Sequence, residues 1–168
     1  MNVAGVFLEL FGRIVPLAHD AAGGLDASQL AATPAPGTNS IGWLVWHLAR
    51  VQDHHIAELL DAPQLWETGD WAAAVGLEPD PRNTGYGHSA ADVAAVRPTG
   101  PAAVLDYLDA VDQRTRSYLE GVTEEDLDRV VDRRWDPPVT LAVRLVSVAD
   151  DCLQLAGQAA YVRGLLGF

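Results

Sequence analysis

Four long segments of this chain repeat apolar residues every three or four positions, which is the spacing of one helix face. None of the intervening stretches alternates polar and apolar residues as a half-buried strand does. This pattern predicts an all-α fold, a four-helix bundle, in which each apolar stripe packs against its neighbours. The predicted helices are approximately 2–21, 40–60, 101–119 and 141–166.

Residues that favour helix ends mark the limits of these segments. Asn39 or Ser40 can cap the second helix, because either side chain can accept from a free N–H of the first turn. That helix should stop before Pro63. Thr99 is the predicted cap of the third helix, and Thr140 that of the fourth.

The stretch 63–98 is irregular and separates the second helix from the third. It contains WETGDW, PDPRNTGYGHS and the short helix-like SAADVAAV, and a loop of this length is often functional. A second irregular stretch, RRWDPPV, reads as extended chain. We expect three tryptophans in these stretches to pack loops onto the bundle, namely Trp66, Trp71 and Trp135. The whole chain, 1–168, is predicted to be one domain.

Charge and composition exclude several classes of function. The 11 basic and 23 acidic residues give a net charge of −12, which repels a phosphate backbone and argues against nucleic-acid binding. No apolar run reaches the ~18 residues of a membrane span. The lone Cys152 and the lack of a signal peptide predict a cytoplasmic protein.

The second predicted helix carries three histidines. Its core face holds Ile41, Leu44, Val45, Leu48, Ile56 and Leu59. His47 and His54 share another stripe with Trp43, but seven residues separate them by roughly 10 Å, too far for one metal ion. His54 and Glu58 have the i, i+4 spacing of a ligand pair, and His55 is predicted to point away from both other histidines. The plainer interpretation is that these histidines form a solvated face.

The fourth predicted helix carries a polar stripe with one exception. The stripe follows a spacing of three and four residues through Arg144, Ser147, Asp151, Gln154 and Gln158. It fits either a solvated face or the lining of an interior cleft. Leu155 lies beside Asp151 on that stripe and is out of pattern. Cys152 is turned about 100° from Asp151 and is predicted to be a buried core residue.

These features together resemble the DinB-like superfamily of four-helix bundles, which includes mycothiol-dependent maleylpyruvate isomerase. The similar segments are NSIGWLVWHLARVQDHHIAELL, TGYGHS with ADVAAVRP, RRWDPPVTLAVRLVSV and DDCLQLAGQAAYVRGLL. They cover almost the whole chain. No nucleotide-binding glycine motif or nucleophile elbow competes with this assignment.

The resemblance implies a site for Zn or Ni with three protein ligands. His47 matches the first ligand and Asp151 the acidic one, but Leu155 stands where relatives have a histidine. Leucine cannot bind a metal, so the resemblance implies an incomplete triad, with no tightly bound ion expected. Three residues are candidates to replace the missing ligand: His54, His88 and Gln158.

The resemblance also implies two alternative functions. In the first, the protein is a transferase or isomerase that uses a mycothiol-type thiol, and Tyr86 and His88 help to wall the pocket. In the second, it is a metal-free protein that binds a small molecule or acts as a homodimeric accessory protein. The residues expected to line the pocket in either case are Trp43, His54, Tyr86, His88, Ser147, Gln154 and Gln158.

Overall fold

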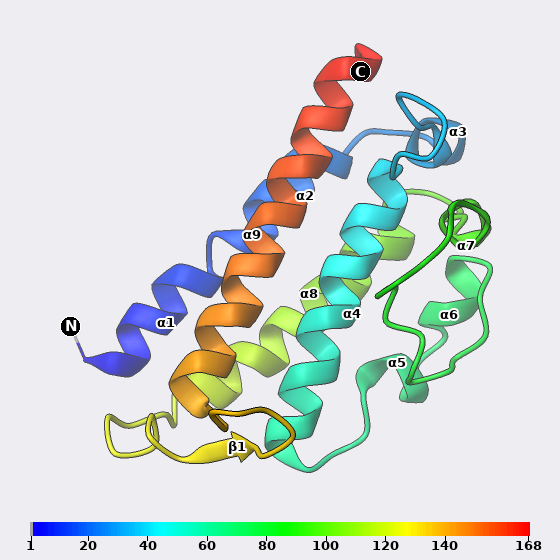
Figure 1. Cartoon of the computed structure of the whole chain (residues 1–168). Helices are drawn as coiled ribbons and strands as arrows, with labels where there is room; N and C mark the ends of the chain where they lie inside the picture. Colours follow the sequence, from blue (N-terminus) through cyan, green and yellow to red (C-terminus); the bar gives the residue numbers. More distant parts are fainter. Residues whose placement is uncertain (1) are drawn as a thin grey trace.

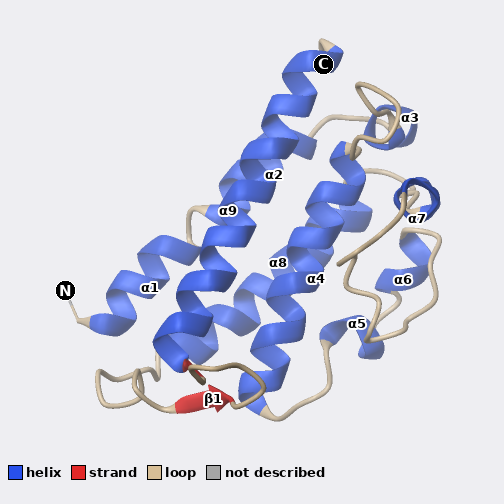
Figure 2. Cartoon of the chain, viewed as in Figure 1, coloured by secondary structure: helices blue, strands red, loops and turns tan. Residues whose placement is uncertain are grey.

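The structure, a computed structural model, describes residues 2–168. Helices make up most of these residues, and strand is confined to one small hairpin at an end of the bundle (Figure 2). None of the described helices is long and apolar enough to cross a membrane. The elements are α1 (Val3–Phe11), α2 (Ile14–Ala22), α3 (Ala27–Ala31), α4 (Ile41–Leu60), α5 (Leu65–Thr68), α6 (Trp71–Ala74), α7 (Ala90–Ala95), α8 (Ala102–Leu119), β1 (Val130–Asp132), β2 (Val139–Thr140) and α9 (Leu141–Leu166).

The long helices form the predicted four-helix bundle (Figure 1). The α1–α2 pair serves as one of its four members, beside α4, α8 and α9. α4 packs mainly against α9 and α8, and α2 packs against the same two helices. Their apolar stripes meet in one core, whose members with at most 1% exposure include Phe11, Ile14, Leu44, Leu48, Leu108 and Leu145.

The helix predicted over 2–21 is in fact two helices. α1 and α2 are separated at Gly12 and Arg13. Pro16 explains the break, because its ring would collide with the carbonyl of residue 12 in a continuous helix. The break also brings Gly12 against α8, where an added Cβ would lie only 2.9 Å from Nη2 of Arg116.

The ends of the two site-bearing helices lie where the sequence predicts. The Ser40 hydroxyl caps α4, and the Thr140 hydroxyl caps α9, each accepting from an N–H of the first turn. The start of α8 differs, since Pro101 precedes it and no side chain caps it. Thr99 therefore lies before the helix and is not its cap.

The stretch 61–98 covers one side of α4 with α5, α6 and α7 (Figure 1). Trp66 on α5 is fully buried and packs edge-on against Trp46, with ring centroids 6.0 Å apart. Every residue from 41 to 50 is buried as a result. The solvated-face interpretation is therefore wrong for His47, which is only 9% exposed. A helical wheel cannot show this, because the covering segment lies elsewhere in the sequence.

A short hairpin precedes α9. β1 pairs antiparallel with β2, and Val130 lies opposite Thr140. The stretch RRWDPPV, predicted as extended chain, mostly forms the connecting loop of this hairpin. Trp135 in that loop is 66% exposed, so the expectation that it packs onto the bundle is wrong.

Candidate functional site

A cavity of about 690 Å³ opens between α4, α9 and two loops, one before α7 and one before α9. This volume lies within the range of sites for small organic ligands, about 300–1,000 Å³. We call this cavity the cleft. The residues lining it are His47, Val51, His54, His55, Arg82, Thr84, Tyr86, Trp135, Val139, Val143, Arg144, Ser147, Val148 and Asp151.

His47 lines the cleft from α4 and is held in one tautomer. Its Nδ1 hydrogen-bonds the carbonyl oxygen of Thr84. Because a carbonyl oxygen can only accept, Nδ1 carries the proton and Nε2 keeps its lone pair. Burial lowers the pKa of His47, although the Thr84 carbonyl and Asp151 both oppose this shift. The ring is thus neutral near pH 7 and has one free acceptor, Nε2.

The loop reaches the His47 ring only because residue 85 is glycine. Gly85 has a φ of +98°, and a Cβ at this position would lie 2.6 Å from Nδ1 of His47. Any side chain here would therefore push the loop and the Thr84 carbonyl away. Trp43 also packs against the ring, with centroids 4.7 Å apart. The imidazole is held by its neighbours before any ligand binds.

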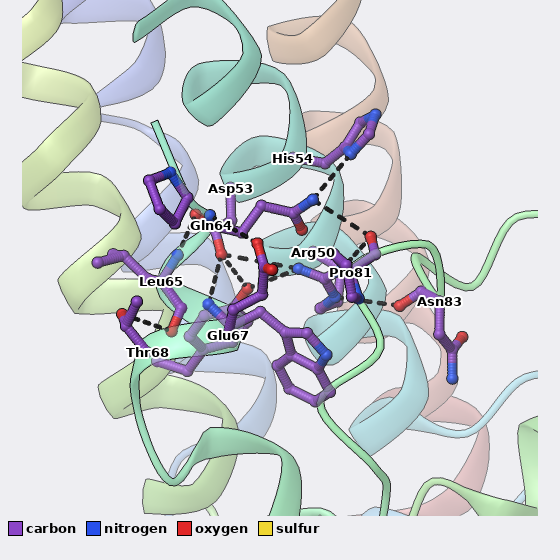
Figure 3. Close-up of polar contacts among 12 residues, drawn as sticks. Arg50, Asp53, His54, Gln64, Leu65, Glu67, Thr68, Pro81 and Asn83 are labelled. Atoms are coloured by element: carbon purple, nitrogen blue, oxygen red, sulfur yellow. Dashed lines mark hydrogen bonds and ion pairs between the residues drawn. The ribbon is translucent and has the colours of Figure 1, made fainter. Parts of the chain in front are cut away.

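Arg50, one turn after His47, anchors the same loop (Figure 3). Its Nε donates to the carbonyl of Asn83 at 3.1 Å, and its Nη2 donates to the carbonyl of Pro81 at 3.0 Å. The guanidinium is fully buried. Since Thr84 directly follows Asn83, these two hydrogen bonds position the carbonyl that fixes the tautomer of His47.

Asp53 balances the buried charge of Arg50. Its Oδ1 accepts from the N–H of Leu65 at 3.0 Å, and its Oδ2 accepts from the N–H of Trp66 at 2.9 Å. The Tyr107 hydroxyl donates to Oδ2 at 2.7 Å and accepts from Nη1 of Arg50. We call Arg50, Asp53 and Tyr107 the anchor network. With its charges paired and hydrogen-bonded, its role is to hold the structure together.

Asp151 lines the cleft from α9 and has no such partners. Within residues 2–168 no donor hydrogen-bonds its carboxylate, whereas the adjacent Asp150 accepts from Gln154 at 2.8 Å. Burial raises the pKa of the Asp151 carboxyl, and His47 across the cleft opposes this shift. The cleft lining thus holds the two carboxylate oxygens of Asp151 and Nε2 of His47 as acceptors that receive no hydrogen bond from residues 2–168.

A tightly held Zn or Ni ion does not fit the residues present at this place. Leu155, one turn after Asp151, is 6% exposed and does not line the cleft. Its side chain has no ligand atom. His47 and Asp151 alone fall short of the three protein ligands that a catalytic zinc site keeps.

A second cluster, His54, His55 and Glu58, has potential ligand atoms within 4.8 Å of one another. Arg144 already supplies its positive charge. Its Nη1 donates to Glu58 Oε2 at 2.7 Å and to Nδ1 of His55, and its Nη2 donates to Asp132 at 2.9 Å. A divalent ion would have to displace this guanidinium, so the cluster is an ion-pair network. His55 lines the same cleft as His47 and His54, contrary to the prediction that it points away from them.

His54 and His55 are held in the tautomer opposite to that of His47. The Gln64 amide nitrogen donates to Nδ1 of His54 at 3.2 Å and to the carbonyl of Pro81 (Figure 3). In both rings Nδ1 accepts, so the neutral form carries its proton on Nε2. Burial lowers the pKa of both histidines, that of His55 to about 4. These two residues are N–H donors, whereas His47 is an acceptor.

Four residues predicted to line the pocket lie outside the cleft lining. Trp43 Nε1 donates to Nδ1 of His88 at 3.1 Å, and Nε2 of His88 bonds Oδ1 of Asn83 at 2.8 Å. Both ring nitrogens of His88 are thus in use, and it cannot replace a metal ligand without losing these bonds. Gln154 and Gln158 are exposed on α9, beyond the end of the cleft.

The structure adds lining residues that the sequence did not indicate. Trp135 and Val139 come from the hairpin, and Arg82 and Thr84 come from the loop over His47. Tyr86, which the sequence did indicate, is 92% exposed at the cleft. Their places depend on how two irregular loops fold onto the bundle, and no residue spacing reports that.

Comparisons with known proteins identify relatives of the chain. A family model described as the DinB superfamily matches residues 16–154. The crystal structure of a conserved protein from Enterococcus faecalis covers 100% of this chain and 99% of that chain, with 33% sequence identity and a TM-score of 0.91. A search of curated proteins gives no match.

Proposed function

Because this chain belongs to the DinB superfamily, we propose that its function lies in the cleft, which binds a small organic molecule without a tightly held metal ion. The observation that supports this most is the state of His47. Its ring is fixed by the Thr84 carbonyl, and its Nε2 is free inside a cavity of suitable size. Arranging a side chain in this way is characteristic of a binding or reactive group.

His47 can also take a proton from a bound ligand. A neutral imidazole with a free Nε2 is a general base, and the Asp151 carboxylate would stabilise the imidazolium that forms. The Thr84 carbonyl keeps the ring oriented during the transfer, since Nδ1–H remains hydrogen-bonded. Binding and proton transfer are thus both available from residues of this chain.

Histidine NMR tests whether the cleft binds ligands. We expect millimolar benzyl alcohol or benzylamine to shift the ¹⁵N signal of His47 Nε2 and the backbone signal of Ser147. The signal of His19 should not move, because His19 bonds Asp109 and does not line the cleft. If no probe moves the cleft signals, the proposal that the cleft is a ligand site is wrong.

Elemental analysis tests the metal-free part of the proposal. Protein purified without a metal-binding tag, then exposed to Zn or Ni and dialysed, should carry far less than one equivalent of metal. The variant His47→Ala serves as the control for a site at His47. Stoichiometric metal in the wild type that is lost in this variant would show that another ligand completes the triad.

A second candidate function is thiol conjugation by His47 acting as a base. The acceptor Nε2 favours it, because the thiolate and not the thiol is the nucleophile. His47 would take the proton from sulfur, the thiolate would form a C–S bond to an activated alkene, and the imidazolium would return the proton to the adduct. Mycothiol with maleylpyruvate is the test reaction, and His47→Ala should abolish any rate enhancement. Failure of this assay would leave the binding function intact.

We also propose that the protein forms a homodimer through α9. Four exposed apolar side chains along α9 and just after its end are Val146, Tyr161, Leu165 and Phe168, each at least 40% exposed. The C-terminal end of the helix stands clear of α4 in Figure 1. Sedimentation should show a dimer that Leu165→Glu converts to a monomer, and a monomeric wild type would overturn the proposal.

A further inference from the structure

We propose that the ligand of the cleft carries a protonated amine, which binds between His47 and Asp151. This inference rests on the proposed binding function and adds the chemical class of the ligand. It follows from counting the donors and acceptors that the cleft leaves free. The competing class is a carboxylate, which would instead bind at the donor histidines.

The pair contributes three acceptor atoms. His47 offers Nε2, because its Nδ1 proton is already donated to Thr84. Asp151 offers two carboxylate oxygens that receive no hydrogen bond from residues 2–168. An alkylammonium group has three N–H donors and no acceptor, so it matches this set of acceptors in number and in kind.

The charges around the cleft leave Asp151 without a counter-ion. Arg144 is committed to Glu58 and Asp132, at 2.7 and 2.9 Å. Arg82 is paired with Asp80 at 3.0 Å and is largely exposed. Since each cation lining the cleft has its own carboxylate, the charge of Asp151 is available to a ligand.

The other walls of the cleft fit the body of an organic amine better than a bare ion. Trp135 and Tyr86, from separate loops, expose most of their rings and line the cleft. Val139 and Val143 add aliphatic surface next to them. Aromatic faces attract organic cations, and burying these exposed rings is favourable in itself. A bare metal ion would use neither.

Three probes of similar size and different charge test the proposal. At pH 7 benzylamine is a cation, benzyl alcohol is neutral and phenylacetate is an anion. Titrations followed by NMR should give a Kd for benzylamine about tenfold lower than that for benzyl alcohol, as one charge-assisted hydrogen bond provides. Phenylacetate should bind more weakly than either.

Two matched variants separate Asp151 from the overall charge of an acidic protein. Asp151→Asn should bring the Kd of benzylamine to within twofold of that of benzyl alcohol. Asp150→Asn removes the same charge at the adjacent, exposed residue and should keep the preference for the amine. Equal losses in the two variants would show general attraction only and would overturn the inference.

The outcomes also distinguish this inference from the binding function beneath it. If benzyl alcohol or phenylacetate binds in the cleft as tightly as benzylamine, the amine inference is wrong and the binding function stands. If none of the probes shifts the cleft signals, both are wrong. Only a preference for the amine that Asp151→Asn removes and Asp150→Asn keeps supports the inference.

Discussion

The anchor network and the cleft differ sharply in the partners that they give a carboxylate, although both include residues of α4. Asp53 in the anchor network accepts three hydrogen bonds and lies 3.6 Å from Arg50. Asp151 in the cleft accepts none from residues 2–168. Leaving a partly buried charge without partners costs free energy, so native proteins keep such groups mainly where function requires them.

This contrast separates the polar groups of this chain that stabilise the fold from those that are open to a ligand. The buried Arg50 fixes the loop whose Thr84 carbonyl orients His47. The satisfied network thus supports the unsatisfied site, and Arg50 lies one turn from His47 on α4. Mutations should separate them, since one set changes stability and the other changes binding.

Breaking the anchor network should cause the greatest loss of stability. Asp53→Asn keeps the side-chain volume but leaves Arg50 buried without its counter-ion. We expect it to lower the free energy of unfolding by about 3–5 kcal/mol, measured by urea denaturation. If that variant does not fold, Tyr107→Phe should still fold, with a free energy of unfolding lower by about 1–2 kcal/mol. The exposed Asp106→Ala on α8 is the control, and a similar loss there would contradict the comparison.

The next effect concerns the ligand missing at position 155. In Leu155→His, Zn or Ni should bind and stabilise the native state by about 2.7 kcal/mol at a hundredfold excess over Kd. The measurement is the shift in Tm on adding metal, so any cost of the substitution itself cancels. Leu155→Ala opens similar space without a donor and should show no shift. Absence of a shift in both variants would mean that His47 and Asp151 are not the remains of a metal triad.

The donor side of the cleft should make stability depend on pH. Burial, helped by Arg144 and His54, lowers the pKa of His55 from 6.5 to about 4, although Glu58 opposes this shift. Between these pH values His55 is protonated in the unfolded chain but not in the folded chain. The free energy of unfolding therefore falls as the pH drops from 6.5 to 4. The loss should be on the order of 2 kcal/mol. His55→Gln should flatten the profile, and identical profiles would show that other groups cause it.

The sequence was enough for the framework of the molecule and for part of the site. Caps at Ser40 and Thr140, together with local apolar spacing, place α4 and α9 correctly, and with them His47 and Asp151. Local rules fail where residues distant in sequence decide the outcome. The burial of His47 depends on the loop at Gly85, and no helical wheel includes that loop. Trp135 is exposed at the cleft because its hairpin folds over the end of the bundle. The spacing of apolar residues does not predict this position either.

The same substitution, Asp to Asn, should have little effect on stability when it is made in the cleft. Asp151→Asn should alter the free energy of unfolding by less than about 0.5 kcal/mol, since no residue of 2–168 hydrogen-bonds the carboxylate. Burial raises the pKa of this carboxyl, so a neutral amide should be tolerated or slightly stabilising. Urea denaturation at pH 7 measures both Asp→Asn variants side by side. If Asp151→Asn lowers the free energy of unfolding by more than about 1 kcal/mol, Asp151 is a structural residue like Asp53. Its charge would then no longer support ligand binding in the cleft.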